Sequence, residues 1–183
     1  MAECAIMISL AFALSWVILW KMPMGGSVTL ASMLPIMLIS IKHGPRIGLG
    51  TAFLYSLTQL GQAISQCDVF IYCQGAAVVI ICALFDYIIP FSLLGLSGIF
   101  AKRSATGAYI GMIAATLMRF FCHVLTGVVI WGQWAPEGMS KIIYSIGYNG
   151  GFLLPDLAIC IAVAIPLLQI KQMRRLLGLT NQK

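Results

Sequence analysis

Four side chains that can carry a proton or form several hydrogen bonds lie inside apolar segments of this chain. Arg119 and His123 stand four residues apart in the apolar stretch 109–131, so a helix would place them on one face. Asp86 and Asn149 lie in two other apolar stretches. A carboxylate, a guanidinium, an imidazole and an amide could together bind a small polar molecule. Ionisable groups at membrane depth are costly enough to indicate function.

Aromatic residues accompany these four positions along the chain. Aromatic faces stack on heteroaromatic rings and attract cations, and the Asn149 amide can pair with both a ring nitrogen and an amino group. The set therefore favours a small, planar, polar ligand over a bare ion. The six cysteines show neither CxxC spacing nor a Cys/His pairing suited to a metal, so no metal site is predicted. The aromatic candidates are Tyr144, Tyr148, Trp131 and Trp134, of which the two tryptophans could also be interfacial anchors.

Structural roles are open for several of the polar residues. Asp86 and Arg119 could form an ion pair between two helices, because buried charges in membranes pair with one another. His123 could equally be a hydrogen-bonded core residue. For Asp156, which follows Pro155 in an apolar stretch, we expect a structural role, since the proline bends the helix and frees a backbone carbonyl.

The composition indicates what must hold these residues in place. Apolar residues make up 61% of the 183-residue chain, charged residues only 9%, and the mean hydropathy is +0.99. A soluble domain carries roughly 25% charged residues. We therefore predict an all-α integral membrane protein with one domain, residues 1–183, of six transmembrane helices, each near the roughly 20 residues that cross a bilayer. The second stretch is short, and we expect it to be tilted or incomplete. The apolar stretches are about 4–20, 27–41, 47–65, 72–100, 106–133 and 144–170.

The positive charges divide unevenly between the two sides of this arrangement. Alternating spans place eight Lys and Arg residues on the side of both termini, and only Lys21 and Lys141 on the other. The positive-inside rule then predicts cytoplasmic termini, in a multi-pass protein of the cell membrane. The net charge of +6 needs no nucleic-acid partner, and without a GxxxxGK[ST] motif any ATP-driven step must use another chain. The eight residues are Lys42, Arg46, Lys102, Arg103, Lys171, Arg174, Arg175 and Lys183.

Depths along the predicted spans bring the polar residues to a similar level. At about 1.5 Å per residue from the outer ends, Asp86 lies about 20 Å, His123 about 16 Å and Asn149 about 12 Å deep. One cavity in the outer half would hold all three.

The first helix also carries a stripe of small residues, which could pack inside the protein or dock a partner subunit. These small residues are Ala5, Ser9 and Ala13.

Five short segments follow one another over nearly the whole chain. They are Pro23-Met-Gly-Gly-Ser-Val-Thr29, Leu34-Pro-Ile-Met-Leu-Ile-Ser40, Leu84-Phe-Asp-Tyr-Ile88, Arg119-Phe-Phe-Cys-His123 and Tyr144-Ser-Ile-Gly-Tyr-Asn149. Each alone is a weak signal, but their order and spacing form a specific set. Together they resemble the thiamine-specific S component of energy-coupling factor (ECF) transporters, which also matches in length and in the six predicted spans.

The resemblance implies a six-helix bundle that binds thiamine with high affinity near the outer face and is not an enzyme. It implies no cofactor, thiamine being the transported ligand. The loop between the first two helices would cover the site, and its glycines suit a mobile lid. That loop reads Gly25-Gly26-Ser27, without the tryptophan that some relatives use for stacking. The residues that match binding positions of the family are Asp86, Tyr87, Arg119, His123, Trp131, Tyr144 and Asn149.

Thiamine has a cationic thiazolium ring, an aminopyrimidine ring and a hydroxyethyl arm. Asp86 would accept from the amino group or offset the positive charge, Trp131 would stack, and Asn149 would pair with a ring edge. Arg119 would then orient Asp86 rather than touch the cation.

Import would require an ECF transmembrane coupling subunit and two ATPase subunits, with the stripe on the first helix as the docking surface. Two rival functions remain open. One is an S component for another small aromatic nutrient, such as a pyrimidine precursor of thiamine. The other is an autonomous proton-coupled secondary transporter that uses Asp86, Arg119 and His123 as a relay. A membrane enzyme fits least, because no nucleophile or metal constellation accompanies these residues.

Overall fold

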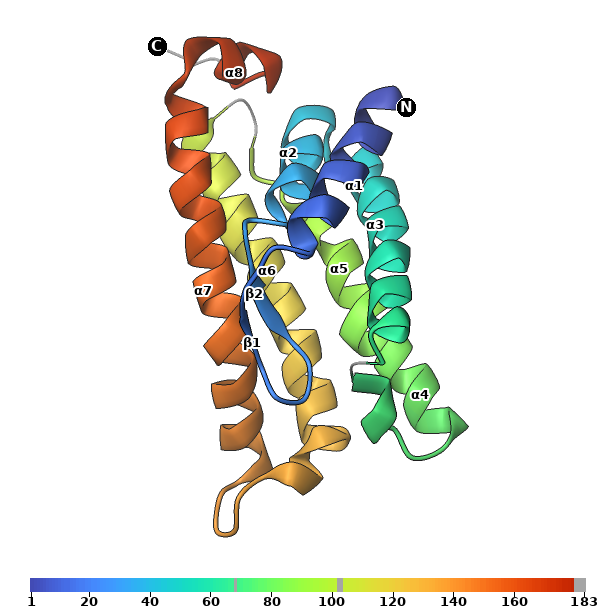
Figure 1. Ribbon diagram of the computed structural model, residues 1–183. Helices are drawn as coiled ribbons and strands as arrows, with labels where there is room; N and C mark the ends of the chain where they lie inside the picture. Colours follow the sequence, from blue (N-terminus) through green and yellow to red (C-terminus); the bar gives the residue numbers. More distant parts are fainter. Residues whose placement is uncertain (68, 102–103, 180–183) are drawn as a thin grey trace.

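Helices dominate the computed structural model, which describes residues 1–67, 69–101 and 104–179 (Figure 1). The N-terminus and α8 lie at the same end of the bundle. The side of the membrane predicted for Lys102, Arg103 and Lys183 concerns positions outside the described residues. The elements are α1 (Ala2–Ser15), β1 (Ile18–Lys21), β2 (Ser27–Thr29), α2 (Leu34–His43), α3 (Pro45–Ser65), η1 (Val69–Tyr72), α4 (Ala76–Cys82), η2 (Ala83–Ile88), α5 (Ile89–Leu93), η3 (Leu94–Leu96), α6 (Ala105–Val129), η4 (Trp131–Trp134), α7 (Lys141–Gln169) and α8 (Lys171–Leu176).

Three helical segments in the described part of the chain are long and apolar enough to cross a membrane. They are the continuous run Ala76–Leu96, which joins α4, η2, α5 and η3, together with α6 and α7. The helix α3 has 21 residues, but its second half contains Gln59 and Gln62. The mainly helical, membrane-compatible fold expected from the sequence is confirmed at this level.

The first third of the chain differs from the sequence prediction. The helix expected over residues 4–20 ends at Ser15, and residues 27–41 do not form one helix. Instead β1 and β2 pair antiparallel, and α2 begins only at Leu34. The turn requires φ angles of 92° at Gly25 and 83° at Gly26, which residues with a side chain rarely adopt. With 14 and 10 residues, α1 and α2 are about 21 and 15 Å long, too short for a hydrocarbon core of about 30 Å.

The helix α2 is too short to span the membrane, and its apolar faces are explained by burial inside the protein. Every residue from Leu34 to Ile41 is buried, because α1, α3 and η3 surround this helix. Met33, Ile36 and Met37 are fully enclosed, as are Leu94 of η3 and Met112 of α6. A helix that is hydrophobic on all faces belongs in a core. The bundle is therefore densely packed around α2, and the hairpin continues from this core towards the other end (Figure 1).

The segment that carries Asp86 is a π-helix, η2. Pro90 has no N–H and cannot donate to the carbonyl of Asp86, so the normal α-helical bond is lost at this point. The N–H of Ile89, the residue just before the proline, instead bonds the carbonyl of Leu84, five residues earlier. Single π-turns of this kind occur frequently at functional sites. Here the wider turn presents Asp86 to the bundle interior, where it is 9% exposed.

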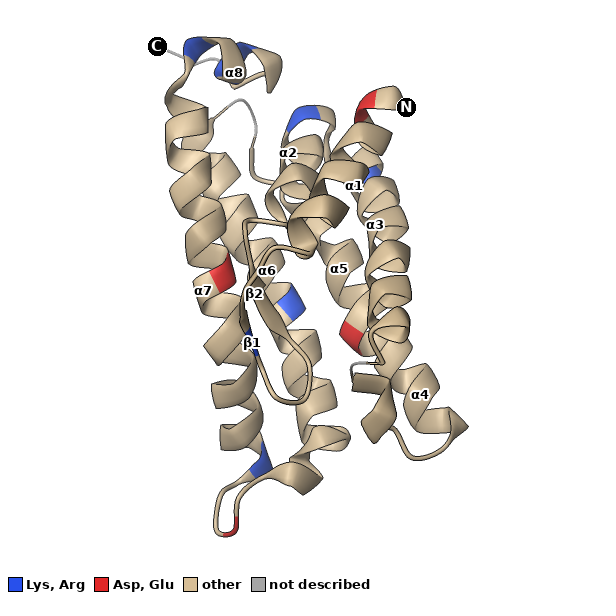
Figure 2. Cartoon of the chain, in the orientation of Figure 1, with Lys and Arg blue, Asp and Glu red and all other residues tan. Residues whose placement is uncertain are grey.

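Basic residues gather at the end of the bundle that holds the N-terminus and α8 (Figure 2). Lys42 lies in the last turn of α2, Arg46 lies in the first turn of α3, and three further basic residues lie on α8. Lys141 begins α7 at the opposite end. The cytoplasmic position of both termini stays a prediction, with this distribution as its support.

Candidate functional site

A cavity of about 130 Å³ lies between the hairpin, α3, η2, α6 and α7. It collects polar groups from segments far apart in the sequence. Of the residues that sequence reasoning singled out, Trp134 does not line the cavity: it is 48% exposed and packs edge-on against Tyr72, with ring centres 5.9 Å apart. The predicted residues that do line it are Asp86, Tyr87, Arg119, His123, Trp131, Tyr144, Tyr148, Asn149, Gly25, Gly26 and Ser27.

Helical spacing accounts for the walls that α6 and α7 contribute. Arg119, His123 and Gly127 recur every four residues on α6, and all three line the cavity. On α7 the same spacing aligns Tyr144 and Tyr148, and continues through Phe152 to Asp156. Residues four apart lie one above another on a helix face.

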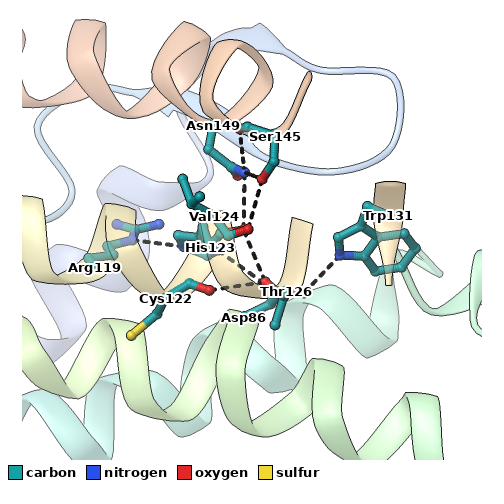
Figure 3. A network of polar contacts seen from close by, with 9 residues as sticks. All are labelled: Asp86, Arg119, Cys122, His123, Val124, Thr126, Trp131, Ser145 and Asn149. Carbon is teal, nitrogen blue, oxygen red and sulfur yellow. Dashed lines mark hydrogen bonds and ion pairs between the residues drawn. The ribbon is translucent and has the colours of Figure 1, made fainter. Parts of the chain in front are cut away.

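The Asp86 carboxylate is held by three donors from the α6 side (Figure 3). Its Oδ1 accepts from His123 Nδ1 at 3.2 Å and from the hydroxyl of Thr126, and its Oδ2 accepts from Trp131 Nε1 at 3.1 Å. Hydrogen bonds to an ionised group are stronger than neutral ones, and a buried carboxylate needs them. The negative charge is therefore fixed in position while its residue still lines the cavity.

The proton on His123 can be assigned from its neighbours. Arg119 Nε lies 3.3 Å from His123 Nε2, and a guanidinium only donates, so Nε2 is the acceptor. The proton then sits on Nδ1 and is donated to Asp86. Arg119, His123 and Asp86 thus form a directed chain of hydrogen bonds. The direct ion pair between Asp86 and Arg119 that the sequence left open does not form, and any orienting effect of Arg119 on Asp86 passes through His123.

The remaining contacts of Arg119 are with uncharged groups. Its Nη1 lies 2.9 Å from Met33 Sδ, and its Cζ lies 3.9 Å from the centre of the Phe91 ring. Such a cation–π contact stabilises a guanidinium removed from water. Among the described residues, no carboxylate oxygen lies within 4.0 Å of this guanidinium. Arg119 is 6% exposed, so a buried positive charge here makes its direct contacts with aromatic, sulfur and imidazole groups.

The Asn149 amide is oriented by the protein itself. Its Nδ2 donates to the carbonyls of His123 at 3.1 Å and Ser145 at 2.9 Å, which uses both N–H groups. In the described part of the chain no donor bonds its Oδ1. We expected Asn149 to offer a ligand both a donor and an acceptor. In the structure only the acceptor, Oδ1, is available to a ligand.

The hairpin tip, which holds the predicted lid residues Gly25, Gly26 and Ser27, is attached to α7. Tyr148 Oη accepts from Met24 N at 3.0 Å and donates to the carbonyl of Gly25 at 2.9 Å. A Cβ on Gly26 would lie 2.8 Å from Phe152 Cε1. The absence of a side chain at this position therefore lets the hairpin lie directly on the aromatic wall of the cavity.

Asp156 anchors the other end of the hairpin. Its Oδ1 accepts from the backbone N–H and the hydroxyl of Thr29, both at 2.9 Å. Asp156 is 3% exposed, and it also lines the cavity at its inner end. These contacts fit the structural role expected for this residue, although the partner is the β-strand and not a carbonyl freed by Pro155.

Several residues that line the cavity or bond Asp86 were not found by sequence reasoning. Thr126 and Gly127 follow His123 by three and four residues, and Phe152 follows Tyr148 by four, so extending the helical spacing would have found all three. The missing Cβ of Gly127 allows Ser145 and Asn149 to approach α6. Four further polar residues, Ser15, Gln59, Gln62 and Gln66, come from α1 and α3. The three glutamines could have been recognised from their spacing of three and four residues, which places their amides on one helix face.

The small-residue stripe on α1 is fully accessible in this structure. Ala5, Ser9 and Ala13 are all exposed, whereas Ala11 and Ser15 face the bundle. Ser9 Oγ bonds the carbonyl of Ala5, so its polarity is satisfied within the helix. The structure thus leaves the stripe unused for internal packing.

Comparisons with known proteins place the geometry in context. The model of the family described as "Thiamine transporter protein" matches residues 1–176. The chain is 34% identical over 177 residues to the thiamine transporter ThiT of Bacillus subtilis (strain 168), covering 88% of this chain and 85% of that protein. It is 36% identical over 99 residues to ThiT of Lacticaseibacillus paracasei, covering 48% and 49%. A solved structure of ThiT from Listeria monocytogenes superimposes with a TM-score of 0.74 at 26% identity, covering 94% and 95%.

Proposed function

Because this chain belongs to the thiamine transporter family, we propose that it is the thiamine-binding subunit of an ECF-type importer. It captures thiamine at the outer face of the cell membrane, and partner subunits drive its release inside. The observation that carries the proposal is Asp86: a buried carboxylate, held by three donors, in a cavity lined by aromatic rings. Such a site suits a planar organic cation.

Different side chains of the cavity recognise different parts of the thiamine molecule. The fixed charge of Asp86 offsets the thiazolium charge or accepts from the aminopyrimidine. Asn149 Oδ1, which has no donor from the described residues, accepts from an N–H at a ring edge. Trp131 supplies a stacking face while its indole N–H remains bonded to Asp86. Arg119 acts through His123 and does not touch the cation.

The hairpin is the proposed lid. Its tip is attached to α7 by Tyr148, lies against Phe152 and lines the cavity. If the basic end of the bundle is cytoplasmic, the lid and cavity lie in the outer half of the membrane. Loops that close over a bound ligand exclude water from it.

The exposed face of α1 is the proposed docking surface for the transmembrane coupling subunit, which in turn binds two ATPase subunits. Small residues at four-residue spacing let a second helix approach closely. Ala5, Ser9 and Ala13 meet this condition and remain exposed.

Titration of the purified, detergent-solubilised protein with thiamine tests this function. We expect saturable one-to-one binding at nanomolar to low micromolar thiamine, seen as quenching of tryptophan fluorescence and confirmed by calorimetry. Competition with an unlabelled pyrimidine precursor separates thiamine from the nearest rival ligand. No binding to a sample that elutes as a single folded species would refute the proposal. Thiamine uptake by this chain alone, driven by a pH gradient, would instead support the secondary-transporter rival.

A further inference from the structure

The cavity has a second polar wall, made by α3 and the end of α1, which the proposed roles above leave unused. Gln59, Gln62 and Gln66 lie at spacings of three and four residues, so they share one face of α3. All three line the cavity, as does Ser15 at the end of α1. The wall is therefore built from three amides and one hydroxyl, all neutral groups.

Internal hydrogen bonds fix the orientation of two of these amides. Gln62 Oε1 accepts from Ser15 Oγ at 2.8 Å and from Gln59 Nε2 at 3.3 Å. Gln59 Nε2 also bonds Ser15 Oγ at 3.1 Å. The oxygen of Gln62 and the nitrogen of Gln59 therefore point towards Ser15. The Nε2 of Gln62 and the Oε1 of Gln59 must then point away from it.

Each of these two amides keeps one polar atom available. No partner among the described residues bonds Gln62 Nε2, which can donate, or Gln59 Oε1, which can accept. Both side chains are only half-buried and lie at the cavity wall. A hydroxyl group both donates and accepts, so it can bond both amides at once. A neutral hydroxyl also suits a wall without a charged side chain.

We propose that Gln59 and Gln62 form the subsite for the hydroxyl of the ligand's arm, and that they set the preference of this protein for hydroxylated over deoxygenated ligands. The proposal rests on the proposed function, since thiamine is the ligand that carries such an arm. Gln62 Nε2 donates to the hydroxyl oxygen, and the hydroxyl donates to Gln59 Oε1. Ser15 positions both amides without touching the ligand.

A purely structural role for the cluster would give a different result. If the amides only joined α1 to α3, their removal would weaken the binding of every ligand by a similar factor. A hydroxyl subsite instead affects only ligands that carry the hydroxyl. The ratio of two affinities, measured on the same variant, therefore separates the two roles.

The experiment compares thiamine with an analogue in which the hydroxyethyl arm is replaced by an ethyl group. By calorimetry, the unmodified protein should bind thiamine about five- to tenfold more tightly than the analogue, as expected for a net hydrogen bond. In Gln62→Leu and in Gln59→Leu this ratio should fall towards one. Thr58→Val is the matched control, because its hydroxyl bonds the carbonyl of Tyr55 within α3 and does not line the cavity.

The outcomes are distinct. If the unmodified protein binds both ligands with equal affinity, the proposed hydroxyl subsite is refuted by that measurement alone. An unchanged ratio in both leucine variants would also overturn it, whereas a ratio near one in these variants and a normal ratio in Thr58→Val would support it. Failure of the unmodified protein to bind thiamine at all would instead refute the proposed function.

Discussion

At the scale of single residues, the site is organised around one carboxylate whose partners are all donors. His123, Thr126 and Trp131 each give a hydrogen bond to Asp86, and Arg119 fixes the proton of His123 on the nitrogen that faces Asp86. The protein thereby orients the negative charge before any ligand arrives. Such preorganisation lowers the cost of binding, because fewer groups must be ordered on association.

Replacing Asp86 with Asn should weaken thiamine binding tenfold or more, which corresponds to about 1.4 kcal/mol. The amide removes the negative charge, and its NH2 group cannot accept from Trp131 or His123. Isothermal titration calorimetry measures the change. Glu137→Gln is the control, because it removes the same charge from an exposed position. Equal affinities for the two variants would remove Asp86 from the binding site.

Fluorescence distinguishes the two tryptophans near the cavity. Trp131 lines the cavity and bonds Asp86, whereas Trp134 is directed at Tyr72 and is half exposed. We expect Trp131→Phe to remove most of the quenching caused by thiamine and to weaken binding. Trp134→Phe should retain both the quenching and the affinity. The reverse pattern would show that the ligand lies against η4 on its outer side.

At the scale of elements, the helical faces were predictable and the first third of the chain was not. The spacing of Arg119 and His123 predicts the shared face of α6 that the structure confirms. The same spacing aligns Tyr144 and Tyr148 on α7, although the prediction did not use it. The hairpin was missed because the apolar residues on both sides of its glycine turn give the same signal as short helices. The π-turn at Asp86 could be predicted only if one knew that the helix continues through the proline four residues later.

The hairpin contact at Gly26 can be tested against a glycine of the same conformation. Gly26 has φ 83° and a Cβ there would meet Phe152, whereas Gly138 has φ 80° and open space around it. Both Ala substitutions strain the backbone, but only Gly26→Ala should lift the hairpin from the cavity. We expect Gly26→Ala to raise the dissociation rate of thiamine several-fold, measured by stopped-flow fluorescence. If Gly138→Ala has the same effect, backbone strain and not the contact with Phe152 is responsible.

At the scale of the whole molecule, the bundle has a densely packed end and a binding end. The packed core surrounds α2, and the cavity lies next to the hairpin. An ion pair joins α1 to α2 at the densely packed end, where Glu3 lies 2.6 Å from Lys42 and 2.9 Å from His43. Hydrogen bonds from Lys42 and His43 hold the pKa of Glu3 below its usual value. With α1 held at this end, its outer face has a defined position relative to the cavity.

This arrangement predicts that docking and binding can be separated by mutation. Ser9 lies on the exposed face of α1 and does not line the cavity, so Ser9→Trp should leave the affinity for thiamine unchanged. The bulky ring should prevent close approach of a partner helix and block uptake. Ile110→Trp, at a position 50% exposed on α6, adds a similar ring to a different face and should allow uptake. Uptake of labelled thiamine in cells that co-express the partner subunits measures both variants.

Normal uptake by Ser9→Trp would exclude this face of α1 as the docking surface. Loss of uptake by both variants would show that a bulky side chain on either face is enough to block uptake, and that the effect is not specific to a contact at α1.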